Sequence, residues 1–457
     1  MTNWQQGELI ELEITDLNDD GDGVGRAFNR VVFVPDTVPG DVVEARLVFV
    51  KPKFGHAILK KILKSSIHRV RPSCIVADKC GGCSWQHIDY QYQLEAKRNQ
   101  VVQALERIGG FVAPRVDEVL HSTALSYRNK ATYPVGISAT GNFVAGYYQK
   151  NSHQIININQ CPVQDERLNP LLHKVKLDIQ SNGWQPYNEK LHTGLIRHIS
   201  LRIGRRTGEV LITLVINQWN IPGIEAVAQE WLDSTPTLVG VMLNLNGERT
   251  NAIFGRESRL VAGRNFLREE FTELEFQVRP DTFFQVYTET AEALVQQIKM
   301  ELGLKGKETL LDAYCGIGTL TLPLARYVGQ AIGIEVQPEA IEQARTNAQH
   351  NGIDNVKFYA GTVEKVILSI DVKPDIVVLD PPRKGCDKSV IQALLDLKPK
   401  RIVYVSCKVA TLARDLKILC QDGVYTLMRV TPADFFPQTA HVETAAYLVL
   451  SQLDIGS

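Results

Sequence analysis

Two kinds of segment are missing from this chain of 457 residues. The first residues, Met-Thr-Asn-Trp-Gln-Gln-Gly, are polar and do not resemble the apolar core of a signal peptide. No apolar run approaches the roughly 18 residues that a membrane-spanning helix requires. We therefore expect a cytoplasmic protein with no membrane partner.

An excess of charge is also missing, because 50 Lys and Arg residues offset 51 Asp and Glu residues. The resulting net charge of −1 is not typical of a non-specific nucleic-acid binder. The exception is local, since residues 46–71 contain eight Lys or Arg residues and neither Asp nor Glu, together with Phe49 and Phe54. This run is either a solvated face or a surface that binds phosphates.

The length suggests about three domains. Short predicted strands with turn signals fill residues 1–62, which we interpret as a small β-barrel with a glycine-spaced loop at 16–25. Residues 63–275 form a central β-rich domain. It includes a predicted helix at about 90–108 that we expect to pack on the third domain. In residues 276–457 strands and helices alternate regularly, which predicts a doubly wound, Rossmann-like α/β sheet.

Eight cysteines in a cytoplasmic protein are better explained by metal binding or catalysis than by disulfide bonds. Cys74, Cys80 and Cys83 lie within ten residues, and two glycines separate the last pair. Those glycines let the backbone turn tightly enough for both thiolates to face one ion. Cys161 is the next available fourth ligand. Zinc and an iron–sulfur cluster both accept four thiolates, so the spacing leaves both open.

A complete dinucleotide-binding fingerprint is absent. Gly316 and Gly318 follow the predicted strand 309–314 and permit close backbone approach to a cofactor. Glu335, about twenty residues further on, ends the next strand and would accept hydrogen bonds from ribose hydroxyls. The third glycine of the NAD fingerprint is missing, because Leu320 and Thr321 occupy that region. The pattern therefore favours S-adenosylmethionine over NAD.

One cysteine lies where the predicted strand 401–406 passes directly into a helix. In open α/β sheets ligands bind beyond the carboxyl ends of the strands, and a thiol near a helix N-terminus has a lowered pKa. Cys407 is therefore placed as an activated nucleophile. The alternative is a small buried residue, because free cysteine is among the most buried residue types.

Two carboxylates are also candidates for the cleft beyond the strand ends. Asp380 begins an Asp-Pro-Pro-Arg sequence after the predicted strand 375–379, where two prolines would hold it over the cofactor cleft. The alternative is a rigid turn. Glu443 lies at the start of the final predicted strand, after a loop that contains a proline. Its carboxylate either reaches the same cleft as Cys407 or is a surface charge. In amino-methyltransferases an aromatic residue that stacks on a purine follows the two prolines, whereas Arg383 stands here.

Residues 1–62 resemble the TRAM domain, an RNA-binding barrel related to the OB fold, through Asp-Gly-Asp-Gly-Val-Gly-Arg at 20–26, Val-Phe-Val-Pro at 32–35 and Pro-Gly-Asp at 39–41. The rest resembles the RNA 5-methyluridine methyltransferases. The motifs are Cys-Gly-Gly-Cys-Ser-Trp-Gln-His at 80–87, Asp-Thr-Phe-Phe-Gln at 281–285, Asp-x-Tyr-Cys-Gly-x-Gly at 312–318, Asp-Pro-Pro-Arg at 380–383, Ser-Cys at 406–407 with Thr-Leu-Ala-Arg-Asp at 411–415, and His-Val-Glu at 441–443.

This resemblance implies a TRAM barrel, a central domain with a [4Fe-4S] cluster and a class I methyltransferase domain. It assigns the cluster to Cys74, Cys80, Cys83 and Cys161. It makes Cys407 the nucleophile and Glu443 the general base, and it assigns Gln285, Tyr314, Glu335 and Asp380 to S-adenosylmethionine. Residues 127–130 also fit the family, either as an RNA contact or as ordinary strand surface.

The implied reaction demands these residue types. Carbon 5 of uracil is not nucleophilic enough to take a methyl group, so a thiolate must first add to carbon 6. A base must then remove the proton from carbon 5 before the thiolate leaves. The target base must also leave any stack to enter the pocket.

The RNA substrate is expected to be 23S ribosomal RNA, by analogy with family members that carry both barrel and cluster. Transfer RNA is the alternative, and we expect a monomer. Two rivals are an amino-methyltransferase that acts on a purine and an RNA-binding protein with an inactive methyltransferase fold.

Overall fold

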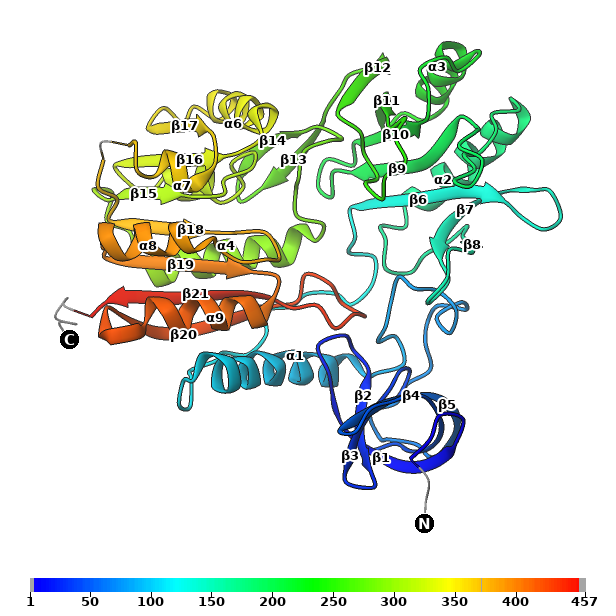
Figure 1. Ribbon diagram of the computed structural model, residues 1–457. Coiled ribbons are helices and arrows are strands. Elements are labelled where there is room, and N and C mark those ends of the chain that lie inside the picture. Colours follow the sequence, from blue (N-terminus) through cyan, green and yellow to red (C-terminus); the bar gives the residue numbers. More distant parts are fainter. Residues whose placement is uncertain (1–3, 371, 452–457) are drawn as a thin grey trace.

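The computed structural model describes residues 4–370 and 372–451, which form three parts (Figure 1). The first is a closed barrel with the strand order β1-β2-β3-β5-β4. Its apolar side chains alternate inward, as in β1, where Ile10, Leu12 and Ile14 are buried. The predicted barrel is thus confirmed. Its strands are β1 (Leu9–Leu17), β2 (Gly23–Ala27), β3 (Arg30–Val34), β4 (Val42–Val50) and β5 (Phe54–Lys64).

The prediction that residues 16–25 form only a loop is wrong, because β2 begins at Gly23 and pairs with both β1 and β3. A side chain would not fit at either of the two glycine positions in this strand. A Cβ on Gly23 would lie 2.0 Å from the Thr37 hydroxyl oxygen, and one on Gly25 would lie 2.5 Å from the Glu13 carbonyl oxygen. Glycine here marks close packing inside the barrel and is no sign of a turn.

The central part is a seven-stranded sheet with the order β12-β11-β10-β9-β6-β7-β8. Side chains from helices α2 (Leu168–Ser181) and α3 (Ile224–Ser234) share one core with alternate residues of the sheet, so both helices cover the same face. The strands are β6 (Lys130–Ile137), β7 (Phe143–Tyr148), β8 (Ile155–Asn157), β9 (Ile196–Ile203), β10 (Val210–Ile216), β11 (Leu238–Leu245) and β12 (Glu257–Gly263).

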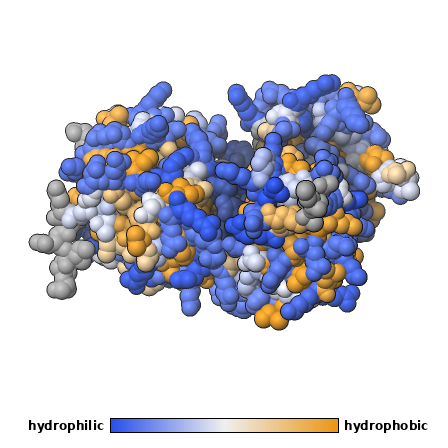
Figure 2. All heavy atoms as spheres, turned by 60° about the horizontal axis from the view of Figure 1, so that its bottom comes forward, coloured by the Kyte–Doolittle hydropathy of each residue, from blue (hydrophilic) through white to orange (hydrophobic). Residues whose placement is uncertain are grey.

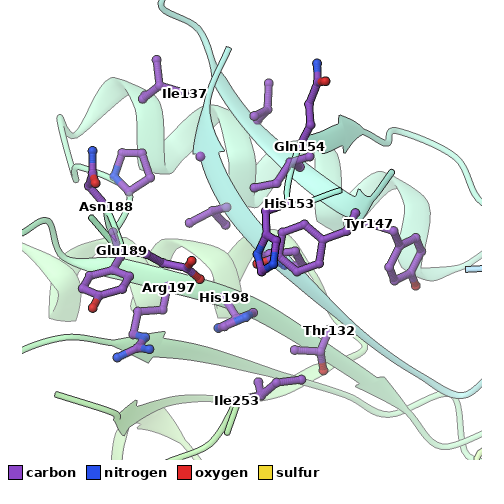
Figure 3. Close-up of a pocket in the computed structure, with 18 of the residues that line it drawn as sticks. Thr132, Ile137, Tyr147, His153, Gln154, Asn188, Glu189, Arg197, His198 and Ile253 are labelled. Atoms are coloured by element: carbon purple, nitrogen blue, oxygen red, sulfur yellow. The ribbon is translucent and has the colours of Figure 1, made fainter. Parts of the chain in front are cut away.

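The opposite face of the central sheet is covered over only part of its width. Leu211 and Met242 pack there against the hairpin of β13 (Leu267–Phe271) and β14 (Leu274–Val278), in a core shared with the α/β part. Around β6, β7 and β9 the same sheet is hollowed into the pocket of Figure 3.

The third part confirms the predicted doubly wound sheet, which has the order β17-β16-β15-β18-β19-β21-β20. All neighbouring pairs from β17 to β19 are parallel, whereas β21 runs antiparallel between β19 and β20. The strands are β15 (Thr309–Asp312), β16 (Gln330–Glu335), β17 (Val356–Ala360), β18 (Ile376–Leu379), β19 (Arg401–Ser406), β20 (Tyr425–Ala433) and β21 (Glu443–Leu450). The helices are α4 (Thr288–Leu302), α5 (Thr321–Ala325), α6 (Pro338–His350), α7 (Val363–Val366), α8 (Lys388–Leu397) and α9 (Val409–Leu419).

One further helix joins the N-terminal half to this sheet. Helix α1 (Tyr90–Ala104) continues into a π-helical turn at Leu105–Gly109, and it lies beside α9 and β20 in Figure 1. Val101 and Leu105 are buried in the same core as the side chains of α8 and α9. Helix α1 therefore packs on the α/β part although it precedes the central sheet in the chain.

The surface is largely hydrophilic, and its exposed hydrophobic residues occur in small groups (Figure 2). Among the helices of the described ranges, none combines the length and the apolar character that crossing a membrane requires.

Candidate active site

Cys407 lies at the junction that the sequence predicts, between the end of β19 and the start of α9 at Val409. The antiparallel register pairs Ser406 with Thr444. One step further along both strands, Cys407 stands across from Glu443, the first residue of β21. The thiol is half-buried and the carboxyl is only 5% exposed.

Three carboxyls gather at the carboxyl edge of the sheet. Asp312 ends β15, Asp380 follows β18 and Glu443 begins β21. Burial raises the pKa of Asp312 to about 6 and that of Asp380 to about 7. Burial first, and then the charge of Asp380, raises the pKa of Glu443 well above its usual range.

The expectation that a helix N-terminus lowers the pKa of Cys407 is wrong for this ligand-free site. Burial raises the pKa of the thiol, and the negative charges of Glu443 and Asp380 raise it further. Arg383 is the neighbouring charge that lowers it. Burial, together with these two charges, outweighs the partial positive charge of the helix end.

The loop after β15 is fixed against β16 by backbone hydrogen bonds. Gly316 has a φ of 53° and donates its N–H to Glu335 Oε2 at 3.2 Å. The other oxygen of Glu335 accepts from the Gln337 N–H at 3.0 Å. Asp312 accepts a hydrogen bond from the Thr321 hydroxyl at 2.6 Å, which closes the loop from beneath. This glycine turn leaves the backbone open to a ligand beyond the ends of β15 and β16.

The other two residues predicted to bind the cofactor are less closely connected. Tyr314 is half-buried in the same loop, and its hydroxyl donates to Cys386 Sγ at 3.9 Å. Gln285 lies between β14 and α4, where its carbonyl oxygen accepts from Asn129 Nδ2 at 2.9 Å. In the described ranges, no hydrogen bond joins the Gln285 side chain to Tyr314, Glu335 or Asp380.

The four cysteines of the predicted cluster line one small cavity, together with Gln86, Arg128 and Tyr147 among others. Burial raises the pKa of Cys80 and Cys161, and it raises that of Cys83 to about 12. Within residues 4–370 and 372–451, however, no three His, Cys, Asp or Glu side chains form a group suited to a single metal ion. The four thiols surround a space and do not converge on one point.

The loop that precedes Glu443, residues 434–442, is bound to helix α1 by a buried ion pair. Lys97 Nζ lies 2.6 Å from Asp434 Oδ1, and both side chains are fully buried. The same ammonium donates to the Phe436 carbonyl at 3.1 Å, and Tyr90 donates its hydroxyl to Asp434 at 3.1 Å. Sequence reasoning missed Lys97, although it shares the inward stripe of α1 with Gln93, Leu94 and Val101.

The cysteine segment holds the same loop from a second side. Trp85, two residues after Cys83, donates its backbone N–H to the Gln438 carbonyl at 2.9 Å. Tyr127 packs beside Cys80 and Cys161 and donates its hydroxyl to the Pro437 carbonyl at 3.1 Å. Tyr127 is only 1% exposed, so both readings of residues 127–130, RNA contact and strand surface, are wrong for this side chain.

Comparison with known families gives two matches. The tRNA (Uracil-5-)-methyltransferase family matches residues 89–451, and the TRAM domain matches residues 3–60. An uncharacterized RNA methyltransferase of Nostoc sp. is 67% identical over 99% of this chain and 98% of its own length. One from Synechocystis sp. is 54% identical over 97% of this chain and 96% of its own length.

A solved structure is similar over nearly the whole molecule. It is the Pyrococcus abyssi tRNA (uracil-54, C5)-methyltransferase in complex with S-adenosyl-L-homocysteine. The TM-score is 0.76 and the identity 29%, with 96% of this chain and 100% of that chain covered.

Replacement of Lys97 by Met would leave the buried Asp434 carboxylate without its ion-pair partner. We expect the free energy of unfolding to fall by about 3 kcal/mol, as measured by denaturant unfolding, because an uncompensated buried charge is costly. The control is Lys174→Met, which removes a partly exposed pair with Glu230 and should cost less than about 1 kcal/mol. Equal losses in the two variants would contradict this account.

Proposed function

This chain belongs to the tRNA (uracil-5-)-methyltransferase family, and we propose that it methylates carbon 5 of a uridine in RNA through a covalent bond from Cys407 to carbon 6 of the base. The observation that carries this proposal is the pairing of β19 with β21, which sets one thiol across from one carboxyl. Both groups lie at the sheet edge where the glycine turn and Glu335 form a cofactor cradle.

The first step of the proposed reaction is ionisation of the Cys407 thiol to a thiolate. Arg383 supplies a positive charge that favours ionisation of the Cys407 thiol. The sulfur then bonds to carbon 6, the carbon 5–carbon 6 double bond breaks, and its electron pair becomes available at carbon 5.

S-adenosylmethionine, when bound, supplies an electrophilic methyl group on a positively charged sulfur. On the side of the protein, Glu335 would accept from ribose hydroxyls, while Asp380, Tyr314 and Gln285 would complete the site. A positive charge beside the three carboxyls favours their ionised forms. Glu443 therefore becomes a carboxylate in the loaded site.

The last task is removal of the carbon 5 proton. Glu443 takes this proton as the carbon 5–hydrogen bond breaks, the ring double bond re-forms, and the bond between carbon 6 and sulfur breaks. Cys407 leaves as a thiolate and is ready for another uridine. An aromatic residue for stacking on a purine is absent after the two prolines, since Arg383 stands there, which disfavours an amino-methyltransferase.

The four cysteines are proposed to hold a [4Fe-4S] cluster. The four cysteines line one cavity, as four thiolate ligands of a metal site would, and the resemblance of residues 80–87 to the cluster motif of the family supports iron–sulfur over zinc. Metal binding would also compensate the cost of burying the ionised thiols.

The substrate is proposed to be 23S ribosomal RNA, and the protein to act in the cytoplasm. The combination of a TRAM barrel with four clustered cysteines supports this substrate by analogy. Transfer RNA is the second candidate, because the similar solved structure is a tRNA (uracil-54, C5)-methyltransferase.

Two active-site variants test the mechanism. We expect Glu443→Gln to accumulate a covalent protein–RNA adduct, since carbon 6 is attacked but the carbon 5 proton stays. Cys407→Ala should form no adduct and lose methylation by at least about 1000-fold. Denaturing gel electrophoresis with labelled RNA measures both results. If both variants methylate RNA at the normal rate, the assignment fails.

The cluster proposal predicts brown protein with broad visible absorption after anaerobic purification, together with about four iron atoms per chain. Substitution of Cys161 by Ser should remove most of this absorption, whereas Cys420→Ser, outside the cavity, should leave it unchanged. Colourless wild-type protein that contains one zinc ion would contradict the proposal.

Deletion of the gene identifies the substrate. We expect one or more 5-methyluridines to disappear from 23S ribosomal RNA, as measured by nucleoside mapping with mass spectrometry. Loss from transfer RNA alone would establish the second candidate in place of the first.

A further inference from the structure

A large hollow in the described part of the molecule lies on the central sheet, away from Cys407. It has a volume of about 1020 Å³ and is lined by strands β6, β7 and β9 and by residues 186–190 and 250–253 (Figure 3). Its lining residues all precede the α/β part. Its volume is at the upper end of the range for small-ligand sites, so one or two nucleotides fit inside.

The wall of this hollow contains buried polar atoms that lack a partner. Arg197 is only 6% exposed, and its Nη1 donates to the carbonyl oxygens of Asn246 at 2.6 Å and Glu248 at 2.7 Å. Within the described ranges, however, its Nε has no hydrogen-bond partner, and neither has Nδ1 of the neighbouring His198. Both side chains line the hollow, although these two nitrogens are themselves covered by protein atoms.

Aromatic rings form the rest of the wall. Tyr148 and His153 lie with ring centroids 5.5 Å apart, and the Arg197 guanidinium lies 4.3 Å from the centroid of the Tyr187 ring. Figure 3 shows the His153 side chain in the hollow. The aromatic rings would stack on the face of an unpaired base. Amide groups such as that of Asn188 at the rim would form hydrogen bonds with the edge of that base.

A second hollow of about 860 Å³ lies between the central part and the barrel. It shares Tyr147 and Tyr148 with the first hollow, and its other wall includes His56 and Ile58 of β5. On the barrel, His56 belongs to an aromatic cluster with Phe33, Phe49 and Phe54. The exposed lysines of the 46–71 run, including Lys51 and Lys53, lie beside this cluster.

We propose that the hollow on the central sheet is a second RNA-binding site, which takes an unpaired nucleotide of the substrate other than the target uridine. Tyr147 and Tyr148 lie in the walls of both hollows, and the second hollow extends to the TRAM barrel. Rings along the two hollows stack on bases while the lysines at the barrel end neutralise phosphates. This inference rests on the proposed function, because it takes RNA as the substrate.

The variants for the test avoid Arg197, which also holds the 246–248 backbone. His153→Ala combined with His198→Ala removes one stacking ring and one unpartnered ring nitrogen. The control is His173→Ala, an exposed histidine of α2 on the opposite side of the sheet. Thermal unfolding and the affinity for S-adenosylmethionine establish that each variant is folded.

We expect the double variant to raise the KM for RNA about tenfold, because loss of base stacking weakens binding by roughly this factor. Its kcat at saturating RNA should stay within about twofold of the wild type, and the control should match the wild type in both. With RNA that contains 4-thiouridine, photo-crosslinks should map to residues 147–154 or 186–198 of the wild type and decrease in the double variant.

A normal KM without crosslinks in these segments would overturn the proposal. So would binding of free uridine monophosphate at the hollow with no effect of the variants on RNA. If the wild type binds and crosslinks RNA at the hollow but forms no 5-methyluridine, the second site stands and the proposed function fails. The two proposals are thus distinguished by separate measurements.

Discussion

The active site depends on one pairing of strands, the antiparallel ladder between β19 and β21. The neighbouring parallel strands bring their carboxyl ends to one edge, which is enough to collect Asp312, Glu335 and Asp380. A parallel final strand would have left its first residue at the far edge. Because β21 runs in the opposite direction, its first residue, Glu443, lies at the edge where β19 ends and Cys407 follows.

This arrangement concentrates negative charge where water is scarce. Asp380 and Glu443 each raise the pKa of the Cys407 thiol, and Asp380 raises that of Glu443. Such mutual repulsion is unfavourable for the folded protein without ligands, and functional sites commonly carry this kind of cost. A bound cationic ligand would relieve this repulsion.

The alternation of strands and helices in the last 180 residues could be predicted because each element carries its own periodicity. The position of Cys407 followed from the same pattern, since a strand boundary is a local feature. What the sequence could not provide were effects that depend on packing between distant segments. Gly23 and Gly25 resembled turn residues until the barrel around them was known. The raised pKa of Cys407 depends on carboxyls 27 and 36 residues away in the chain.

The loop before Glu443 is held by Trp85, Gln93, Lys97 and Tyr127, which precede their partners by more than 300 residues. During synthesis these four residues are made long before the loop. Strand β21 must then insert between β19 and β20, which have already been made. Cys407 and Glu443 therefore come together only after the residues that hold their loop have been made and β21 has paired with β19.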